Sequence, residues 1–547
     1  MEILENKILS DFQLSASNDI KSVIKDIEGL NSQIVVLKHL PRSGKTYTLL
    51  EYLNNSNSFS LYVSDVHEQM EQLTTNFDKM WVIKGASKMC PLLKEDHAPF
   101  WVKKYFGHGN NGKLKRNIPC ILCDQKDCEY NKQFDFPEAN ATVTIAKESL
   151  VNPRIVSAYD HIIIDEKMDK ANLIQPYCPT FKEDALLSFD YALEIYEVYE
   201  EIKNLIDNKS IIEEREYLEK LKTDAKFISS KKVLGKTIYE IRDLDNNELV
   251  KDVVPFLANL GSTINWMEKC YDINEYRDRF HVPYIHYAFD MLREYGSNLI
   301  FANATFDEGI YNLLKNQYKY DLPEIRTIMD KPIENKNSYL LHYNNLGRSC
   351  SRSGLKGSAE GSIGYFPQIF KMIESIHRFC QKRGLRSGII TFSEYEDCFS
   401  DFNVVDHFVA HRGKNDFDEV DVLVILGTFN IPRLALLDKH YAISGEYLDK
   451  KYLENDYWKT KDINGCKIAI SKHKGLMNTK LFLLYDEHLQ AILRSGAHIN
   501  DKKVVIVFGY VPDGTEKMFS YKKFDSTKQL INGYLTNSYS EGRKRAG

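Results

Sequence analysis

Apolar and polar positions alternate along the first part of the chain in a way that predicts strands followed by helices. Within 18–30, apolar residues recur with the spacing i, i+3, i+4, i+7, which predicts an amphipathic helix. The apolar run 34–37 then leads through HLPRSGKT into the helical stretch TYTLLEYL, and the strand 59–65 leads into the helical stretch EQMEQLTTNF. Strands that alternate with helices predict a parallel sheet.

This alternation is interrupted twice. Residues 84–135 are rich in Lys, Gly, Asn, Cys and His with little periodicity, and we expect an insertion that is held together by something other than an apolar core. The strand pattern returns at 141–146 and 161–166. From 178 to 295 the pattern is mainly helical, as in LEIYEVYEEIKNLI, and predicts a second, helical insertion.

A further strand is predicted at 298–305, and a second alternating region then runs to the end of the sequence. Its predicted strands are 387–392, 420–427, 480–485 and 503–509. The whole pattern predicts an α/β protein with two parallel-sheet regions.

Composition places the chain among soluble globular proteins. It has 547 residues, more than one core supports, and 43% of them are hydrophobic and 27% charged. No run approaches about eighteen apolar residues, so the sequence predicts no transmembrane helix. The stretch MEILENKILSDF lacks the basic and apolar regions of a secretory signal, and we expect a cytoplasmic protein, or a nuclear one if the source is eukaryotic. A net charge of −5 argues against wholesale coating of a polyanion but leaves room for a basic channel.

The loop after the strand 34–37 carries the second half of a phosphate-binding loop. Its GKT triplet follows a buried strand and opens a helix, and in such loops the backbone N–H groups cradle phosphates. Lys45 would then reach the β- and γ-phosphates of ATP, and Thr46 would ligate Mg²⁺. The expected nucleotide-binding residues are Pro41, Arg42, Ser43, Gly44, Lys45 and Thr46. A coincidental turn is the alternative, since His39 replaces the first glycine of the full pattern.

Two carboxylates end the predicted strand 161–166. Ligands collect at the carboxyl edge of open α/β sheets, so we expect Asp165 to hold Mg²⁺ and Glu166 to orient the attacking water. The alternative is a strand that ends in an acid capping the next helix. We therefore predict Asp165 and Glu166 as catalytic residues beside Lys45, with Thr46 and Asp165 as the Mg²⁺ ligands.

Four of the ten cysteines cluster in the first insertion with the spacing C-x29-C-x2-C-x4-C. They are Cys90, Cys120, Cys123 and Cys128. Four thiolates ligate either a tetrahedral Zn²⁺ ion or a [4Fe–4S] cluster, and chemistry alone favours zinc. Either metal would supply folding energy that this insertion cannot obtain from a core. The other six cysteines are scattered, as expected of buried thiols in a reducing compartment.

Cations and aromatic residues flank these cysteines. They are Lys103, Lys104, Lys113, Lys115 and Arg116, with Trp101, Tyr105 and Phe106 between them. Cations for phosphates and aromatic faces for bases suit single-stranded DNA, whereas a solvated basic loop is the alternative.

In their order along the chain, these features resemble those of superfamily 2 helicases of the XPD/DinG iron–sulfur type. LKHLPRSGKT is similar to motif I, LYVSDVHEQMEQL to motif Ia, GASKMC and CILCDQKDCEYNKQF to the cluster segments, and IIIDEKMD to the DEAH motif. LIFANATFD resembles motif III, HRGKNDF with DVLVILGTFNIP resembles motif V, and LQAILRSGAH with VVIVFGYVP resembles motif VI. The resemblance covers most of 30–511.

The resemblance implies roles for further residues. In motif VI, Gln490 and Arg494 would be catalytic, with Arg494 contacting the γ-phosphate. Ala497 stands where the family has a second arginine, and Met168 where it has the DEAH histidine. The motif V residues expected to meet the nucleic-acid backbone are Arg412, Gly413, Gly427, Thr428 and Asn430. The four cysteines would hold a [4Fe–4S] cluster, with Zn²⁺ as the alternative.

The implied architecture is α/β, with two RecA-like parallel-sheet domains and both insertions in the first of them. The expected boundaries are 1–83, 136–177 and 296–335 for the first RecA-like domain, 84–135 for the Fe–S insertion, 178–295 for a helical arch-like insertion and 336–547 for the second RecA-like domain.

The implied function is that of a monomeric, ATP-dependent DNA helicase that acts on single-stranded and forked DNA and moves 5′→3′. Two alternatives stay open. One is a DNA-dependent ATPase or remodeller that does not unwind DNA, and the other is a metal-stabilised DNA-binding protein with a weakened ATPase.

Overall fold

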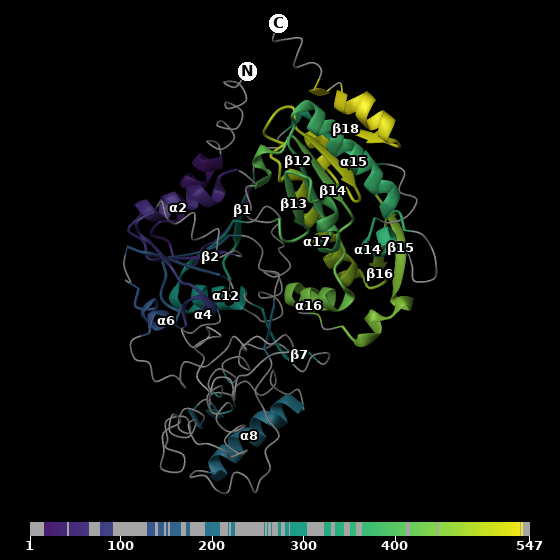
Figure 1. Ribbon diagram of the computed structural model, residues 1–547. Coiled ribbons are helices and arrows are strands. Elements are labelled where there is room, and N and C mark those ends of the chain that lie inside the picture. The colour runs from purple at the N-terminus through teal and green to yellow at the C-terminus, as the bar shows by residue number, and fades with distance from the viewer. Residues whose placement is uncertain are drawn as a thin grey trace.

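The computed structural model describes the chain in blocks. They are 16–40, 43–64, 77–90, 128–136, 140–146, 149–150, 154–165, 171–174, 192–207, 272–274, 279–283, 285–302, 322–329, 334–343, 350–356, 364–411, 416–444, 446, 448–536 and 538–539, with single residues between 217 and 264. Figure 1 shows two α/β units side by side, and helix α8 (Ala192–Asp207) lies away from both. We call these the first unit and the second unit, in chain order.

The first unit is built on a seven-stranded sheet of order β10-β1-β9-β5-β2-β4-β3. Every neighbouring pair in it runs parallel. Its strands are β1 (Ile34–Lys38), β2 (Ser60–Ser64), β3 (Met80–Val82), β4 (Thr142–Ala146), β5 (His161–Asp165), β9 (Asn298–Ala302) and β10 (Ile325–Met329). Helix α12 (Ile285–Tyr295) leads directly into β9 and contacts it.

The core of the first unit forms where helices cover this sheet. Helix α2 (Lys45–Asn55) buries Leu49, Leu50 and Leu53 against Val35 and Leu37 of β1. The helix that occupies 16–27 adds its apolar face to the same cluster. Strands covered in this way read as continuous apolar runs, which is the pattern seen in the sequence.

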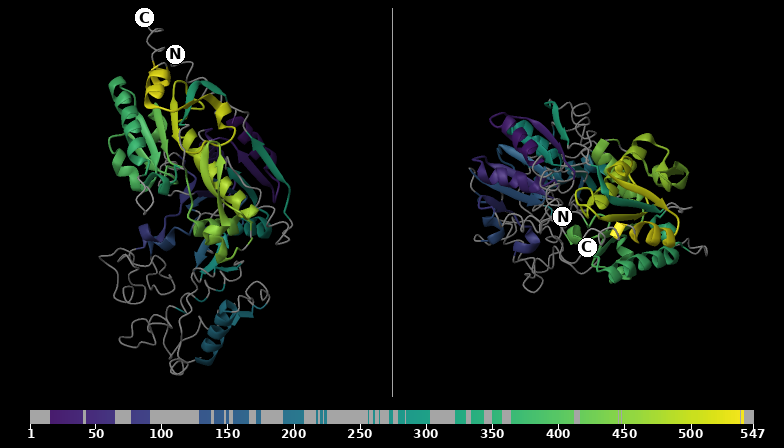
Figure 2. Two further views of the ribbon diagram at one scale, coloured as in Figure 1. Left: turned by 90° about the vertical axis from the view of Figure 1, so that its right-hand side faces the viewer. Right: turned by 90° about the horizontal axis from the view of Figure 1, so that it is seen from above.

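The second unit contains a six-stranded sheet of order β13-β12-β14-β17-β11-β18, again with all neighbours parallel. Its strands are β11 (Asn335–Tyr343), β12 (Ser387–Thr391), β13 (Val404–His407), β14 (Val422–Leu426), β17 (Val504–Phe508) and β18 (Phe519–Phe524). Helices α15 (Phe366–Arg383) and α17 (Lys474–Leu493) lie on opposite faces of this sheet (Figure 2). Both bury apolar side chains in the core of the second unit.

Further elements surround the two sheets. A small antiparallel sheet joins β6 (Ala171–Ile174), β8 (Arg279–Pro283) and β7 (Asp272–Asn274), and a hairpin joins β15 (Trp458–Ile463) and β16 (Cys466–Ser471). The other helices are α4 (Ala86–Met89), α6 (Glu129–Lys132), α14 (Arg352–Lys356), α16 (Arg433–Ser444) and α18 (Thr515–Met518). The 3₁₀ segments are η5 (Ser393–Phe399), η6 (Asp416–Glu419), η7 (Lys450–Leu453) and η8 (Asn455–Tyr457), and η9 (Gln529–Leu535) is of π type. Helix α16 contacts β6 and β8, so the second unit touches the small sheet.

The fold class predicted from the sequence is confirmed: this is an α/β protein with two parallel sheets of seven and six strands, as expected of two RecA-like domains. Sheet membership changes between Met329 and Asn335. The predicted helix EQMEQLTTNF falls almost entirely outside the described residues, as do 91–127 of the predicted Fe–S insertion. Among the described residues, no helix is both long and apolar enough to cross a membrane.

One prediction about secondary structure is wrong. The strand predicted at 480–485 lies within α17. Helix α17 is buried on nearly all sides in its second half, and a short apolar run in such a helix has the same pattern as a buried strand. The stretch 178–295 was expected to be mainly helical, and its described residues include α8 and α12 as well as the antiparallel pair β7 and β8.

Candidate nucleotide site

The topology of the first sheet brings the two predicted nucleotide motifs together. Strands β1 and β5 are separated only by β9, with which both pair in parallel. The carboxyl ends of parallel strands meet at one edge of a sheet, where ligands bind in open α/β folds. The loop after β1 and the acid at the end of β5 therefore share that edge.

The start of α2 is suited to an anion. Gly44 is its N-cap and has φ of 79°, a left-handed conformation that favours glycine. The first turn of α2 contains no acidic residue. The first N–H groups of a helix lack partners within it and carry partial positive charge, so they attract phosphate. Ser43 Oγ is buried and has no hydrogen-bond partner among the described residues, which makes it a further donor suited to a phosphate oxygen.

Thr46 and Asp165 are in direct contact. Thr46 Oγ1 donates to Asp165 Oδ2 at 2.5 Å, across 119 positions of sequence. The hydroxyl of Tyr62, on the buried strand β2, donates to the same carboxylate oxygen. Sequence reasoning missed Tyr62, because a tyrosine in an apolar strand is usually only a core residue. A hydroxyl and a carboxylate supply the kind of oxygen ligand that Mg²⁺ prefers.

Lys45 lies over its own loop. Its Nζ donates to His39 O at 3.0 Å and to Leu40 O at 3.3 Å. To contact a β- or γ-phosphate, the ammonium would exchange these carbonyl oxygens for phosphate oxygens. Leu40 also packs against the apolar core of the second unit, so this loop adjoins both units.

The predicted residues of the second unit lie at the end of α17. Gln490 Nε2 donates to Asp486 Oδ1 at 3.0 Å, one turn earlier in the helix. Arg494 is the C-cap of α17, and its Nε donates to His411 O at 2.7 Å, with Nη2 donating to the same oxygen. The guanidinium therefore holds the turn that precedes the predicted motif V arginine.

Glu487 of α17 holds the same turn from inside the protein. Its Oε1 accepts from Val409 N–H at 2.5 Å and lies 3.0 Å from His411 Nε2. His411 and Glu487 are both fully buried. Val409 has φ of 76°, which is strained for a β-branched residue, and such strain persists only where surrounding contacts impose it. No sequence pattern indicated this arrangement, because its partners lie 76 to 83 positions apart.

Two other motif positions are buried. Thr428 is 3% exposed, with its N–H donating to Cys350 O at 2.7 Å and its hydroxyl 3.1 Å from Cys466 Sγ. It therefore does not present its side chain to a nucleic acid in this state, whereas Asn430 is exposed. Ala497 is fully buried in the core of the second unit, so that position has no room for the arginine of the helicase family.

Two of the four clustered cysteines lie among the described residues, and hydrogen bonds of Gln133, here called the Gln133 clamp, join the segments beside them. Cys90 directly follows α4, and Cys128 directly precedes α6; these two short helices are in contact. Gln133 bonds both backbone groups of Lys84, with Oε1 accepting from its N–H at 2.8 Å and Nε2 donating to its carbonyl at 3.0 Å. Its own carbonyl accepts from Trp81 Nε1 at 2.7 Å. Local helices and one glutamine thus place the outer cysteines of the C-x29-C-x2-C-x4-C pattern on neighbouring segments.

Several predicted residues lie outside the described part of the chain. They are Pro41, Arg42, Glu166, Met168, Cys120, Cys123, Arg412 and Gly413, together with Trp101, Lys103, Lys104, Tyr105, Phe106, Lys113, Lys115 and Arg116.

Comparisons with known proteins find only distant similarity. No protein-family model and no curated protein matches the chain. A truncated XPD structure matches at a TM-score of 0.27 and 13% identity, over 60% of this chain and 99% of that one. A DEAD-box protein from the hyperthermophile Methanococcus jannaschii matches at 0.25 and 10%, over 80% and 82% of the two chains. The Hef helicase domain of Pyrococcus furiosus matches at 0.21 and 11%, over 92% and 95%. Similarity at such TM-scores assigns neither a family nor a function to this chain.

Proposed function

We propose that this chain is an ATP-dependent DNA helicase whose first unit binds and hydrolyses ATP. The observation that carries this proposal is the contact of 2.5 Å between Thr46 Oγ1 and Asp165 Oδ2. It joins the start of the helix after β1 to the end of β5, at the sheet edge where a Mg²⁺-nucleotide binds in folds of this kind. A coincidental GKT turn and an unrelated helix-capping acid would have no reason to meet.

Each residue of this edge then has a task in phosphoryl transfer. The first N–H groups of α2 and the hydroxyl of Ser43 bind phosphate oxygens, and Lys45 neutralises charge on the transferred phosphoryl group. Thr46 and Asp165 hold Mg²⁺, while Glu166 orients the attacking water. Tyr62 positions Asp165 by its hydrogen bond from β2.

The second unit contributes a cation in this proposal. Arg494 would contact a γ-phosphate through its guanidinium when the two units close. Repeated closing and opening of the two units would move single-stranded DNA through the protein in the 5′→3′ direction and would separate the strands of forked DNA. Because Arg494 and Glu487 hold the turn before the motif V residues, they would transmit that movement to the DNA.

The clustered cysteines support a metal centre in the first insertion. Cys90, Cys120, Cys123 and Cys128 would hold a [4Fe–4S] cluster, or alternatively Zn²⁺, and the Gln133 clamp fits such a site by bringing the first and last of these segments together. When bound, the metal supplies folding energy. Anaerobically purified protein should then show a broad brown absorption shoulder, and a colourless, zinc-containing protein would decide for the alternative.

The Lys45→Ala variant tests the proposal. DNA-stimulated phosphate release should fall by about 10²–10³, because a preorganised charge contact to the transferred phosphoryl group is lost. Lys25→Ala, which removes an exposed lysine from the helix at 16–27, serves as the matched control and should hydrolyse ATP normally. Unchanged turnover in Lys45→Ala at an unchanged melting temperature would refute the ATPase.

A second function has one observation in its favour. Lys45 and Arg494 both donate to backbone carbonyls, as expected of a metal-stabilised DNA-binding protein with a weakened ATPase. A DNA-dependent ATPase that does not unwind is the intermediate case. The Cys128→Ser variant distinguishes a helicase from these alternatives. In a helicase, the variant should lose unwinding of a forked duplex but keep ATPase activity, because the nucleotide edge lies outside the insertion. Wild-type protein without any DNA-stimulated phosphate release would favour the DNA-binding protein.

A further inference from the structure

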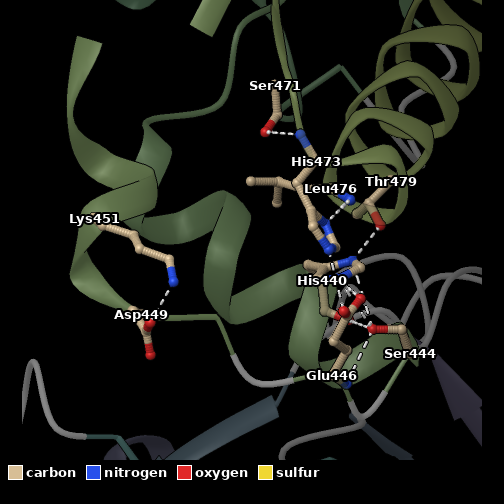
Figure 3. A network of polar contacts seen from close by, with 9 residues as sticks. All are labelled: His440, Ser444, Glu446, Asp449, Lys451, Ser471, His473, Leu476 and Thr479. Carbon is tan, nitrogen blue, oxygen red and sulfur yellow. Dashed lines mark hydrogen bonds and ion pairs between the residues drawn. The ribbon is translucent and has the colours of Figure 1, made fainter. Parts of the chain in front are cut away.

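A second polar cluster lies in the second unit, away from the motifs discussed above. His440 comes from α16, Glu446 follows the end of that helix, and His473 is the N-cap of α17 (Figure 3). His440 Nε2 lies 3.0 Å from Glu446 Oε2, and His473 Nε2 lies 3.1 Å from Glu446 Oε1. One carboxylate therefore bridges two imidazoles.

We propose that His440, Glu446 and His473 form a binding site for a divalent first-row transition-metal ion such as Zn²⁺. This inference is independent of the proposed ATPase, since none of the three residues belongs to the nucleotide edge.

The geometry and the chemistry of the ligand atoms fit such an ion. One ligand atom from each residue lies within 4.8 Å of the other two. Ligands bound tetrahedrally at about 2.0–2.1 Å are about 3.3 Å apart, and each imidazole Nε2 lies at a similar distance from one of the two oxygens of Glu446. Two imidazoles and one carboxylate suit zinc and its neighbours in the first row, whereas Mg²⁺ and Ca²⁺ prefer oxygen.

Exposure is graded across the site. The His440 side chain is 2% exposed, that of His473 24% and that of Glu446 47%. An ion can therefore enter from solvent on the side of Glu446. Three protein ligands leave at least one coordination position for water.

The outer hydrogen bonds of the two histidines differ. His440 Nδ1 lies 2.7 Å from Thr479 Oγ1, which can accept a hydrogen bond from Nδ1–H when Nε2 binds the ion. His473 Nδ1 instead accepts from Leu476 N–H at 3.2 Å, so a neutral His473 carries its proton on Nε2, facing Glu446. Binding an ion there moves this proton to Nδ1 and ends the hydrogen bond to Leu476. In the loaded site, a coordinate bond from Nε2 of His473 would replace that hydrogen bond.

Gly475 permits the three side chains to approach one another. A Cβ at this position would lie 2.9 Å from Glu446 Oε2, 3.0 Å from His440 Cε1 and 3.2 Å from His473 Cε1. Glycine costs stability within the first turn of a helix, so its place here matches a requirement for space beside the cluster.

The ion would link α16 to α17, which are joined in sequence by a connecting segment that contains η7, η8 and the β15–β16 hairpin. Helix α16 is the element that contacts β6 and β8 of the small sheet. Loading the site would therefore stabilise the contact between the second unit and that sheet.

The test is a titration of the full-length, chelator-treated protein with Co²⁺ and with Zn²⁺. Wild type should bind one ion per chain with weak d–d absorption and without thiolate charge transfer, in addition to any ion on the cysteines. His473→Asn keeps a side chain that caps α17 but removes a ligand, and Glu446→Gln removes the charge at an exposed position. Both should weaken this binding by more than about 100-fold. Gly475→Ala, which retains all three ligands, should weaken it by crowding.

Hydrogen exchange adds an independent measurement. Zn²⁺ should speed exchange at the Leu476 amide of wild type and leave it unchanged in Glu446→Gln, while Mg²⁺ should do neither. Glu454→Gln alters an exposed acid of the segment that connects α16 to α17. It is the matched control and should bind the ion as wild type does. The proposal fails if the variants bind as many Co²⁺ ions as wild type, or if all bound Co²⁺ shows thiolate charge transfer.

Discussion

The two parallel-sheet units have similar sheets but end their central strands differently. In the first unit, the start of α2, which follows β1, and the last residue of β5 carry a hydroxyl, an ammonium and a carboxylate at one edge. In the second unit, a glycine directly follows each of β14 and β17, and Gly427 N–H donates to Phe508 O at 2.9 Å. A Cβ on Gly509 would lie only 2.1 Å from Gly427 O.

This difference shows that two sheets of the same kind need not carry the same kind of site. Both sheets are all-parallel, and both are covered by helices, yet only the first presents chemistry suited to a Mg²⁺-nucleotide among the residues that the structure describes. At the corresponding edge of the second sheet, backbone packs on backbone. A parallel sheet therefore provides the place for a site, and the residues at its strand ends decide whether a site exists.

Arg494→Ala tests whether the second unit nevertheless contributes to hydrolysis. A lost arginine finger should reduce DNA-stimulated hydrolysis by about 10³ or more. Loss of the bonds to His411 O should also lower the melting temperature, so rate and melting are measured on one preparation. Near-normal hydrolysis in the folded variant would show that Arg494 serves only to hold the turn. Ala497→Arg should not rescue activity, because position 497 is fully buried.

Gly509→Ala should damage the second unit while sparing the nucleotide edge of the first. The added methyl group would overlap Gly427 O, and overpacking against backbone should cost about 3 kcal/mol or more. Urea unfolding measures this loss. Gly533→Ala is the control, since its nearest side-chain neighbour lies 3.9 Å from the new Cβ, and it should leave stability nearly unchanged. Equal stability of the two variants would contradict the close approach of the strand ends.

Tyr62→Phe tests the proposed Mg²⁺ site of the first unit. It removes one of the two hydroxyls that donate to Asp165, and hydrogen bonds to charged groups contribute about 1.5–3 kcal/mol. The Mg²⁺ concentration that gives half-maximal ATPase activity should rise about 10-fold or more. Tyr52→Phe, on α2, is the control. An unchanged Mg²⁺ dependence would mean that Tyr62 is only a core residue.

Low pH should destabilise the second unit because of its buried histidines. Burial lowers the pKa of His342 to about 4 and that of His488 to about 3. Because the folded-state pKa lies below the unfolded value of about 6.5, stability is full above pH 6.5 and is lost as the pH falls toward the folded values. At pH 5.5 each of these histidines should lower the free energy of unfolding by about 1.4 kcal/mol relative to neutral pH.

Unfolding of wild type and His342→Gln at pH 7.5 and 5.5 measures this dependence. The glutamine side chain keeps hydrogen-bonding groups for Tyr521 and Gly509 but has no proton to gain, so the variant should lose less stability on acidification. An equal loss in both proteins would place the acid sensitivity elsewhere.

Much of this structure follows from local pattern. The apolar runs at 34–37 and 162–164 lie in buried strands, and GKT opens a helix, as periodicity and the glycine predicted. Local pattern failed at 480–485, where an apolar run belongs to α17, because a buried helix and a buried strand are equally apolar.

The contacts that complete the sites depended on tertiary structure. Tyr62 reaches Asp165 because β2 pairs with β5, and Glu487 reaches Val409 because α17 packs against that turn. Nothing near these residues in sequence indicates their partners. Periodicity reports how a residue is buried within its own element, whereas strand order and helix packing decide which distant side chains meet.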